Sequence, residues 1–140
     1  MEQAVVLSIR GQQAYADQEP DVVELVTEGV MRHRDGGWDI RYEETDLTGL
    51  AGVTTEFRVE EGEITLTRSG KMHSQMVFRE GVAHDSLYQM EFGALMLTVC
   101  ATRVKADITE KGGTIDLTYN IEIEHNAAGV IEYHLDIQAK

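Results

Sequence analysis

Residues 114–124 read Thr-Ile-Asp-Leu-Thr-Tyr-Asn-Ile-Glu-Ile-Glu, and this stretch decides the fold class. Apolar residues occupy every second position from Ile115 to Ile123, and polar residues occupy the positions between them. A period of two places all the apolar side chains on one face of an extended strand. Glycines before and after the stretch, at 112–113 and 129, indicate turns on both sides. The stretch is therefore predicted to be a strand with one face in a core and the other in solvent.

The same alternation recurs along most of the chain, and glycine-containing polar turns separate its repeats. No segment shows an apolar stripe of helical period longer than two turns, although residues 46–52 have room for one helical turn. The strands that the pattern predicts are Gln3–Gln12, Val22–Arg34, Trp38–Thr45, Val53–Glu60, Glu63–Arg68, Met72–Arg79, Val82–Tyr88, Ala94–Ile108, Thr114–Glu124 and Val130–Gln138.

The short connections between these strands predict the architecture. Strands joined by short turns are neighbours in a sheet. A meander of this length must close or fold over, because exposed strand edges invite aggregation. We therefore expect an all-β fold, an antiparallel up-and-down barrel of about 8–10 strands in one domain over residues 1–140. A two-sheet sandwich is the alternative, since alternation alone fits both arrangements.

Charge and composition exclude several classes of protein. The 140 residues carry 12 Lys and Arg against 25 Asp and Glu, a formal net charge of -13. This excess of acid argues against a nucleic-acid binder and against a protein held on an anionic membrane, because both need basic patches. The single cysteine, Cys100, excludes an internal disulfide, and we expect it to be an inert buried thiol. The N-terminal stretch lacks a basic region and a long apolar run, so we expect a soluble, cytoplasmic protein.

A few polar residues fall on the positions that should face the core. Glu44 continues the apolar series Trp38, Ile40 and Tyr42, and Arg68 continues the series Ile64 and Leu66. The next predicted strands place Met72, Ser74, Met76 and Phe78, and then His84, Ser86 and Tyr88, toward the interior. A buried charge needs a partner, or its pKa shifts until it is neutral.

Glu44 and Arg68 have three interpretations. In the first, the two side chains pair near a barrel rim and only fix strand register. In the second, Arg68 receives an anionic or carbonyl group of a ligand, because its planar guanidinium can give two parallel hydrogen bonds. In the third, Glu44 is a catalytic acid or base, but no nucleophile or second group is evident, so we expect no enzyme activity. The residues predicted to bind a ligand are Tyr42, Glu44, Arg68, Met76, Phe78 and Tyr88.

The five histidines show no spacing typical of a metal site, so we expect surface histidines and neither a metal nor another cofactor. Glycine-rich phosphate loops and Ser-His-Asp arrangements are absent as recognisable motifs.

Several stretches resemble the YwiB-like family of bacterial proteins, a family of unknown function with a calycin-like β-barrel. They span almost the whole chain in the same order, and they are Glu24-Leu-Val-Thr-Glu-Gly29, Tyr42-Glu-Glu44 followed by Leu47-Thr-Gly49, Thr67-Arg-Ser-Gly70, Met76-Val-Phe78, and Tyr88 followed by Gly93. One departure is Gln89-Met-Glu-Phe92, where the family pattern has Thr and Pro. The resemblance implies a barrel of the class that includes lipocalins and fatty-acid-binding proteins. It implies no activity, since none is established for the family.

These observations favour a barrel that binds a small, anionic or lipophilic molecule inside, with a polar cluster at one mouth. The alternative is a barrel filled by its own side chains that acts as a protein-interaction or regulatory module through its acidic surface. We also expect a homodimer, because apolar residues occupy positions that should face outward: Met31, Val77, Leu95, Leu97 and Val99.

Overall fold

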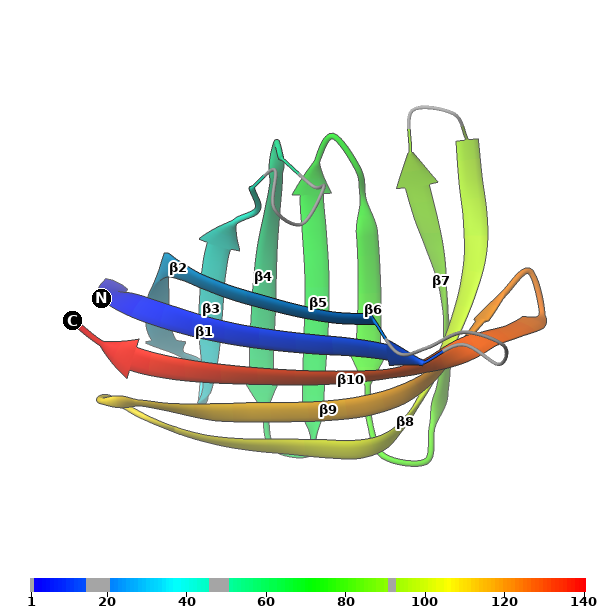
Figure 1. Cartoon of the computed structure of the whole chain (residues 1–140). Coiled ribbons are helices and arrows are strands. Elements are labelled where there is room, and N and C mark those ends of the chain that lie inside the picture. The colour runs from blue at the N-terminus through cyan, green and yellow to red at the C-terminus, as the bar shows by residue number, and fades with distance from the viewer. Residues whose placement is uncertain (1, 15–20, 46–50, 91–92) are drawn as a thin grey trace.

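The computed structural model describes residues 2–14, 21–45, 51–90 and 93–140, and its elements are β-strands (Figure 1). The strands are β1 (Glu2–Ala14), β2 (Asp21–Arg34), β3 (Gly37–Glu43), β4 (Val53–Glu60), β5 (Glu63–Gly70), β6 (Ser74–Phe78), β7 (Ala83–Met90), β8 (Gly93–Thr109), β9 (Gly112–Ile123) and β10 (Asn126–Ala139). Each corresponds to a predicted strand, with ends that differ by a few residues. The helical turn expected in 46–52 falls largely outside the described residues.

All ten strands belong to one antiparallel sheet, with the order β6-β5-β4-β3-β2-β1-β10-β9-β8-β7. Neighbours in the sheet are neighbours in sequence, except where β1 pairs with β10 and joins the two ends of the chain. Figure 1 shows β1, β10, β9 and β8 crossing in front of β3–β6. The continuous sheet confirms the barrel and excludes the sandwich.

The barrel is nearly closed, with a seam between β6 and β7. These two strands form the ends of the sheet order, and His73 and Gln89 link them through two backbone hydrogen bonds of 3.0 and 2.8 Å. A parallel bridge between Glu80, which follows β6, and Ala101 of β8 lies near the opposite end of the seam. Backbone contacts thus close the barrel near both ends of the seam.

The core follows from the period of two. Along β4, Val53, Thr55, Phe57 and Val59 are buried, and the residues between them are only half-buried or exposed. Residues from all ten strands contribute to the interior, and the largest fully buried side chains include Phe57 and Phe78. The burial pattern thus confirms the predicted inward faces of β4 and of β6, on which Ser74 also lies.

The outward positions expected for Leu97, Val99 and Met31 are wrong. Leu97 and Val99 lie in the core with Ala101, because a β-bulge between Ala101 and Arg103 shifts the register of β8 by one residue. A bulge exchanges the two faces of a strand beyond it. Met31 is 1% exposed and belongs to the same core.

The remaining two residues of that set, Leu95 and Val77, are exposed and half-buried respectively. Cys100 is only half-buried, not buried as expected, because it alternates with the inward Val99 and Ala101.

Candidate functional site

A row of polar side chains crosses the interior of β3–β6. The strand registers place Tyr42 opposite Thr55, Thr55 opposite Arg68, and Arg68 opposite Ser74. All four lie on the inward face of their strands, and Thr55 is completely buried. Across the seam, the bridge from His73 to Gln89 brings Tyr88 of β7 to the same level. This row forms the polar wall of the candidate site.

Glu44 directly follows β3 beside this row, and hydrogen bonds to Val53 and Thr55 help to hold it in place. Its N–H donates to the carbonyl of Val53 at 2.9 Å, and the Thr55 hydroxyl donates to its carboxylate at 2.5 Å. Its side chain is 2% exposed. Thr55 therefore fixes the carboxylate at one position on the wall.

Arg68 and Glu44 form the predicted pair, but loosely. The Arg68 Nε lies 3.9 Å from the Glu44 Oε2, which is an ion-pair distance and too long for a hydrogen bond. In the part of the chain that the structure describes, the buried Nε has no hydrogen-bond partner, and the Arg68 side chain is only 17% exposed. The guanidinium is thus largely removed from water and retains hydrogen-bonding capacity.

Two tyrosines from opposite sides of the barrel meet at the site. The hydroxyls of Tyr42 and Tyr133 are 3.0 Å apart, and the Tyr133 ring packs against Phe57 with centroids 5.7 Å apart. Burial raises the pKa of Tyr42, and the neighbouring Tyr133 and Glu44 raise it further, against the influence of Arg68. Burial also raises the pKa of Tyr133, although the hydrogen bond with Tyr42 and the charge of Arg68 lower it. Both hydroxyls therefore remain protonated at neutral pH.

A cavity of about 390 Å³ lies against this wall. Tyr42, Glu44, Arg68 and Tyr133 contribute polar groups to its lining, as do Gln13, Tyr88 and Tyr119. The apolar lining comes mainly from β1, β2 and β8–β10, where it includes Ile9, Leu25, Leu97, Ile121 and Ile131, and Met76 of β6 adds to it. The cavity is therefore amphipathic, and the charged groups of its lining, Glu44 and Arg68, lie together beside β3–β5.

The structure brings together all but one of the residues predicted to bind a ligand. Tyr42, Glu44, Arg68, Met76 and Tyr88 line the cavity. The hydroxyl of Tyr88 donates a hydrogen bond to the Met72 sulfur at 3.3 Å. Phe78 does not line the cavity, because it lies deeper in the core and packs against Tyr119 with centroids 4.6 Å apart.

Sequence analysis missed Tyr133 and Thr55 as members of the site. Both lie on inward faces, but a tyrosine or threonine there does not interrupt the apolar pattern as a charge does. Tyr133 is 91 positions from Tyr42, and only the closure of the barrel through β1 and β10 brings them together. The alternation along β10, which places Tyr133 on the inward face, was the sequence signal that could have identified it.

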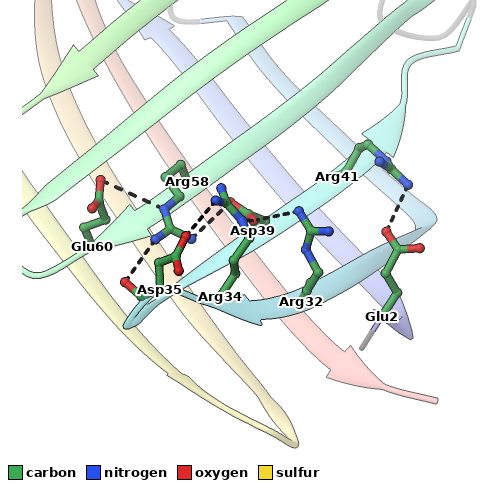
Figure 2. Close-up of polar contacts among 8 residues, drawn as sticks. All are labelled: Glu2, Arg32, Arg34, Asp35, Asp39, Arg41, Arg58 and Glu60. Carbon is green, nitrogen blue, oxygen red and sulfur yellow. Dashed lines mark hydrogen bonds and ion pairs between the residues drawn. The ribbon is translucent and has the colours of Figure 1, made fainter.

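A second polar cluster, also missed, lies on the outer face around Asp39 of β3 (Figure 2). Its carboxylate contacts Arg34 at 2.8 Å, Arg58 at 3.3 Å and Arg32 at 3.4 Å. The arginines come from β2 and β4 on either side, and they cover Asp39 until its side chain is 7% exposed. Burial raises the pKa of Asp39, but the arginines, above all Arg34, outweigh it and hold the pKa below its ordinary value. Because its charges are mutually paired, this cluster is a brace between three strands.

Within the described ranges, no group of three His, Cys, Asp or Glu side chains is placed to hold a metal ion. No helix there is long and apolar enough to span a membrane.

Comparison with known proteins agrees with the barrel. A crystal structure of the YwiB protein from Bacillus subtilis superimposes with a TM-score of 0.89 and 23% sequence identity, over 99% of this chain and 93% of that chain. The B. subtilis sequence, described as an uncharacterized β-barrel protein, is 33% identical over 82 residues, which are 59% of this chain. This match spans 56% of the length of that relative.

The resemblance to the YwiB-like family is thereby confirmed, and with it a barrel fold of uncharacterised role. Residues 7–137 match the family described as a domain of unknown function, DUF1934. The matched range covers nearly the whole chain, from β1 to β10. The chain belongs to the DUF1934 family.

Proposed function

We propose that the barrel binds a small amphipathic molecule in the cavity beside Arg68, with an anionic or carbonyl group at the guanidinium and an apolar body against β1, β2 and β8–β10. The observation that carries the proposal is Arg68 itself. Its side chain is 17% exposed, and its buried Nε has no hydrogen-bond partner in the described part of the chain. Buried polar groups are normally hydrogen-bonded, so this exception needs an explanation. A ligand that brings a hydrogen-bond acceptor to the guanidinium supplies this explanation.

The surroundings of Arg68 suit an acceptor. Glu44 balances the charge of the guanidinium at 3.9 Å, but the carboxylate oxygen nearest Arg68, Oε2, already accepts a hydrogen bond from the Thr55 hydroxyl. The carboxylate therefore does not close onto Arg68 as a tight ion pair. The Tyr42 hydroxyl, kept protonated by burial, adds a neutral donor or acceptor nearby.

The dimensions of the cavity also support binding. Its volume of about 390 Å³ lies within the range of small-molecule sites, which are mostly apolar with a few placed polar groups. The lining of this cavity is likewise mostly apolar with a few polar side chains.

Two related dyes test the proposal. 8-Anilinonaphthalene-1-sulfonate carries an anionic group, and N-phenyl-1-naphthylamine has a similar apolar body without it. We expect saturable binding of both to the folded protein, observed as enhanced dye fluorescence. Arg68→Met should weaken binding of the sulfonate by roughly tenfold or more, the value of a lost charged hydrogen bond, and leave the neutral dye unchanged.

Arg79→Met is the matched control. The Arg79 side chain is 61% exposed and pairs with Glu63 at 3.8 Å, outside the cavity. This variant should bind both dyes like the wild type, and near-UV circular dichroism should show the native fold in each protein. Absence of saturable binding, or equal binding of the sulfonate by Arg68→Met and wild type, would contradict the proposal.

A further inference from the structure

The second half of β8 is a free strand edge. β7 pairs only with residues 93–100 of β8, whereas β9 pairs with it as far as Thr109. In the described parts of the chain, no strand lies along 102–109 on the side away from β9. Figure 1 shows this part of β8 as the lowest strand of the front layer. Proteins normally protect such an edge, because its backbone groups can pair with another chain.

The backbone groups at this edge come from the even-numbered residues. The two-residue turn after Thr109 pairs Thr109 with Gly112, so odd residues of this segment bond to β9. The Val104 N–H accordingly donates away from β9, to the Glu80 carboxylate at 2.9 Å. The N–H and C=O groups of Ala106 and Ile108 face the same side. This places Ala106 at the centre of the edge.

We propose that two copies of this chain pair through this edge, β8 against β8 in antiparallel orientation, with a two-fold axis at Ala106. The segment Val104-Lys-Ala-Asp-Ile108 is complementary to itself about that axis. Ala106 pairs with Ala106 of the second copy, and each Lys105 lies opposite the other copy's Asp107. Val104 lies opposite Ile108 in the same way, and its N–H, which donates to Glu80 in the single chain, exchanges that partner for the carbonyl of the other copy's Ile108. A two-fold interface requires this self-complementarity.

The exposure of these residues agrees with an interface. Lys105 and Asp107 are exposed on the outer face of the strand. Ala106 is exposed on the other face, where Val104 and Ile108 are half-buried. Val104 and Ile108 border a hollow of about 630 Å³ that also contains Trp38 and Ile64. A second strand beside β8 would extend this apolar face by two residues. Directly opposed pairs of opposite charge and of apolar residues are the main contacts that stabilise neighbouring strands.

The charges predict the specificity of the contact. In a dimer of the Lys105→Glu variant, the introduced glutamate of each copy lies opposite Asp107 of the other copy, which makes two repulsive pairs. In a dimer of the Asp107→Lys variant, the introduced lysine of each copy lies opposite Lys105 of the other copy, which again makes two repulsive pairs. Each single variant should therefore weaken dimerisation by roughly tenfold, because two attractive pairs become repulsive. A mixture of the two variants should form a heterodimer as tight as the wild-type dimer, since both opposed pairs are attractive again.

Sedimentation equilibrium of the full chain tests this. We expect a concentration-dependent dimer for the wild type, weaker dimers for each single variant, and restored association in their equimolar mixture. Ala106→Pro should abolish the dimer, because proline lacks the central N–H, while no hydrogen bond to β9 is lost. Ala106→Thr keeps the N–H and is the control. Thermal denaturation of each variant checks that the fold survives, since Lys105 also lies opposite Asp116 of its own chain.

Three results would overturn the proposal. One is a monomer at every concentration, and another is a dimer that survives Ala106→Pro. The third is a mixture of the charge variants that associates no better than either variant alone. If the edge instead receives a segment of a different protein, the chain by itself is monomeric, and the first result reports it.

Discussion

Asp39→Asn tests the brace on the outer face, because it removes one charge while it preserves the shape of the side chain. The Asp39 carboxylate is the common partner of Arg32, Arg34 and Arg58 from two neighbouring strands. An asparagine oxygen still accepts a hydrogen bond, but the three guanidinium groups then lose the carboxylate that they share, although Asp35 still pairs with Arg34 and Glu60 with Arg58. We expect a folded but less stable barrel.

The magnitude follows from the exposure of each partner. Arg32 and Arg34 are 42% and 45% exposed, so solvent screens their contacts, whereas Arg58 is 15% exposed. A hydrogen bond to a largely buried charge contributes about 1.5–3 kcal/mol, and exposed ion pairs contribute about 0–1 kcal/mol. The free energy of unfolding should fall by about 2 kcal/mol, which lowers Tm by about 7 °C in a chain of this length.

The pH dependence identifies the cause. The pKa of Asp39 in the folded protein is lower than its ordinary value of 3.8. The ionised carboxylate therefore stabilises the fold fully above 3.8, and this stabilisation is lost as pH falls through the lower, folded-state pKa. The difference between wild type and Asp39→Asn should be constant near neutral pH and should shrink in strong acid.

Urea denaturation followed by the fluorescence of Trp38, the neighbouring residue and the single tryptophan, gives the measurement. Asp35→Asn is the control, because the Asp35 side chain is 76% exposed and its carboxylate pairs with the exposed Arg34. Its effect should stay within about 0.5 kcal/mol of wild type. If Asp39→Asn is no more destabilising than Asp35→Asn at pH 7, the brace does not exist in solution.

Three further predictions concern other contacts. The hydrogen bond to Asp116 at 2.6 Å raises the pKa of His134, so the charged imidazole stabilises the fold fully below pH 6.5 and no longer at alkaline pH. His134→Gln should therefore lower the free energy of unfolding by less than about 1 kcal/mol below pH 6.5 and leave it unchanged at alkaline pH. Urea titrations at two pH values would show this difference, and a loss independent of pH would refute it. Tyr42→Phe and Tyr133→Phe should each cost about 1 kcal/mol, and the double variant should cost less than their sum; an additive cycle would contradict the hydroxyl contact. Phe57→Ala, at a fully buried position, should cost about 3–5 kcal/mol in the same assay, and a loss below 1 kcal/mol would place Phe57 outside the core.

The strands were predictable because each carries its own alternation of apolar and polar residues. Which residues of β8 face the core was not predictable. Between Leu95 and Cys100 both parities are apolar except at Thr98, and past Arg103 the apolar residues are Val104, Ala106 and Ile108. For an uninterrupted strand, the sequence therefore predicts that the even positions face inward throughout. The bulge at 101–103 reverses this for the first half, and its position has no mark in the sequence that we could use.

The interior charges were predictable for the opposite reason. Glu44 and Arg68 each interrupt an apolar series, and both prove to be largely buried. Asp39 was missed because it occupies an outward position, where an acid is expected. Its burial comes from arginines on the adjacent strands. The tight turn at Asp35-Gly36, where both residues have positive φ, sets Arg32 opposite Asp39, so the register contained this information.

Register also connects the fold to the candidate site. Tyr42, Thr55, Arg68 and Ser74 form one row only because β3–β6 keep a continuous register. A slip of one residue in β5 would turn Arg68 to the outer face and bring a neighbour to the cavity. The two-residue turn at Glu61-Gly62, with Gly62 at a φ of 74°, fixes the pairing of β4 with β5. The position of the buried guanidinium is therefore determined at a turn on the far end of the strand, and changes at that turn should alter the cavity without touching it.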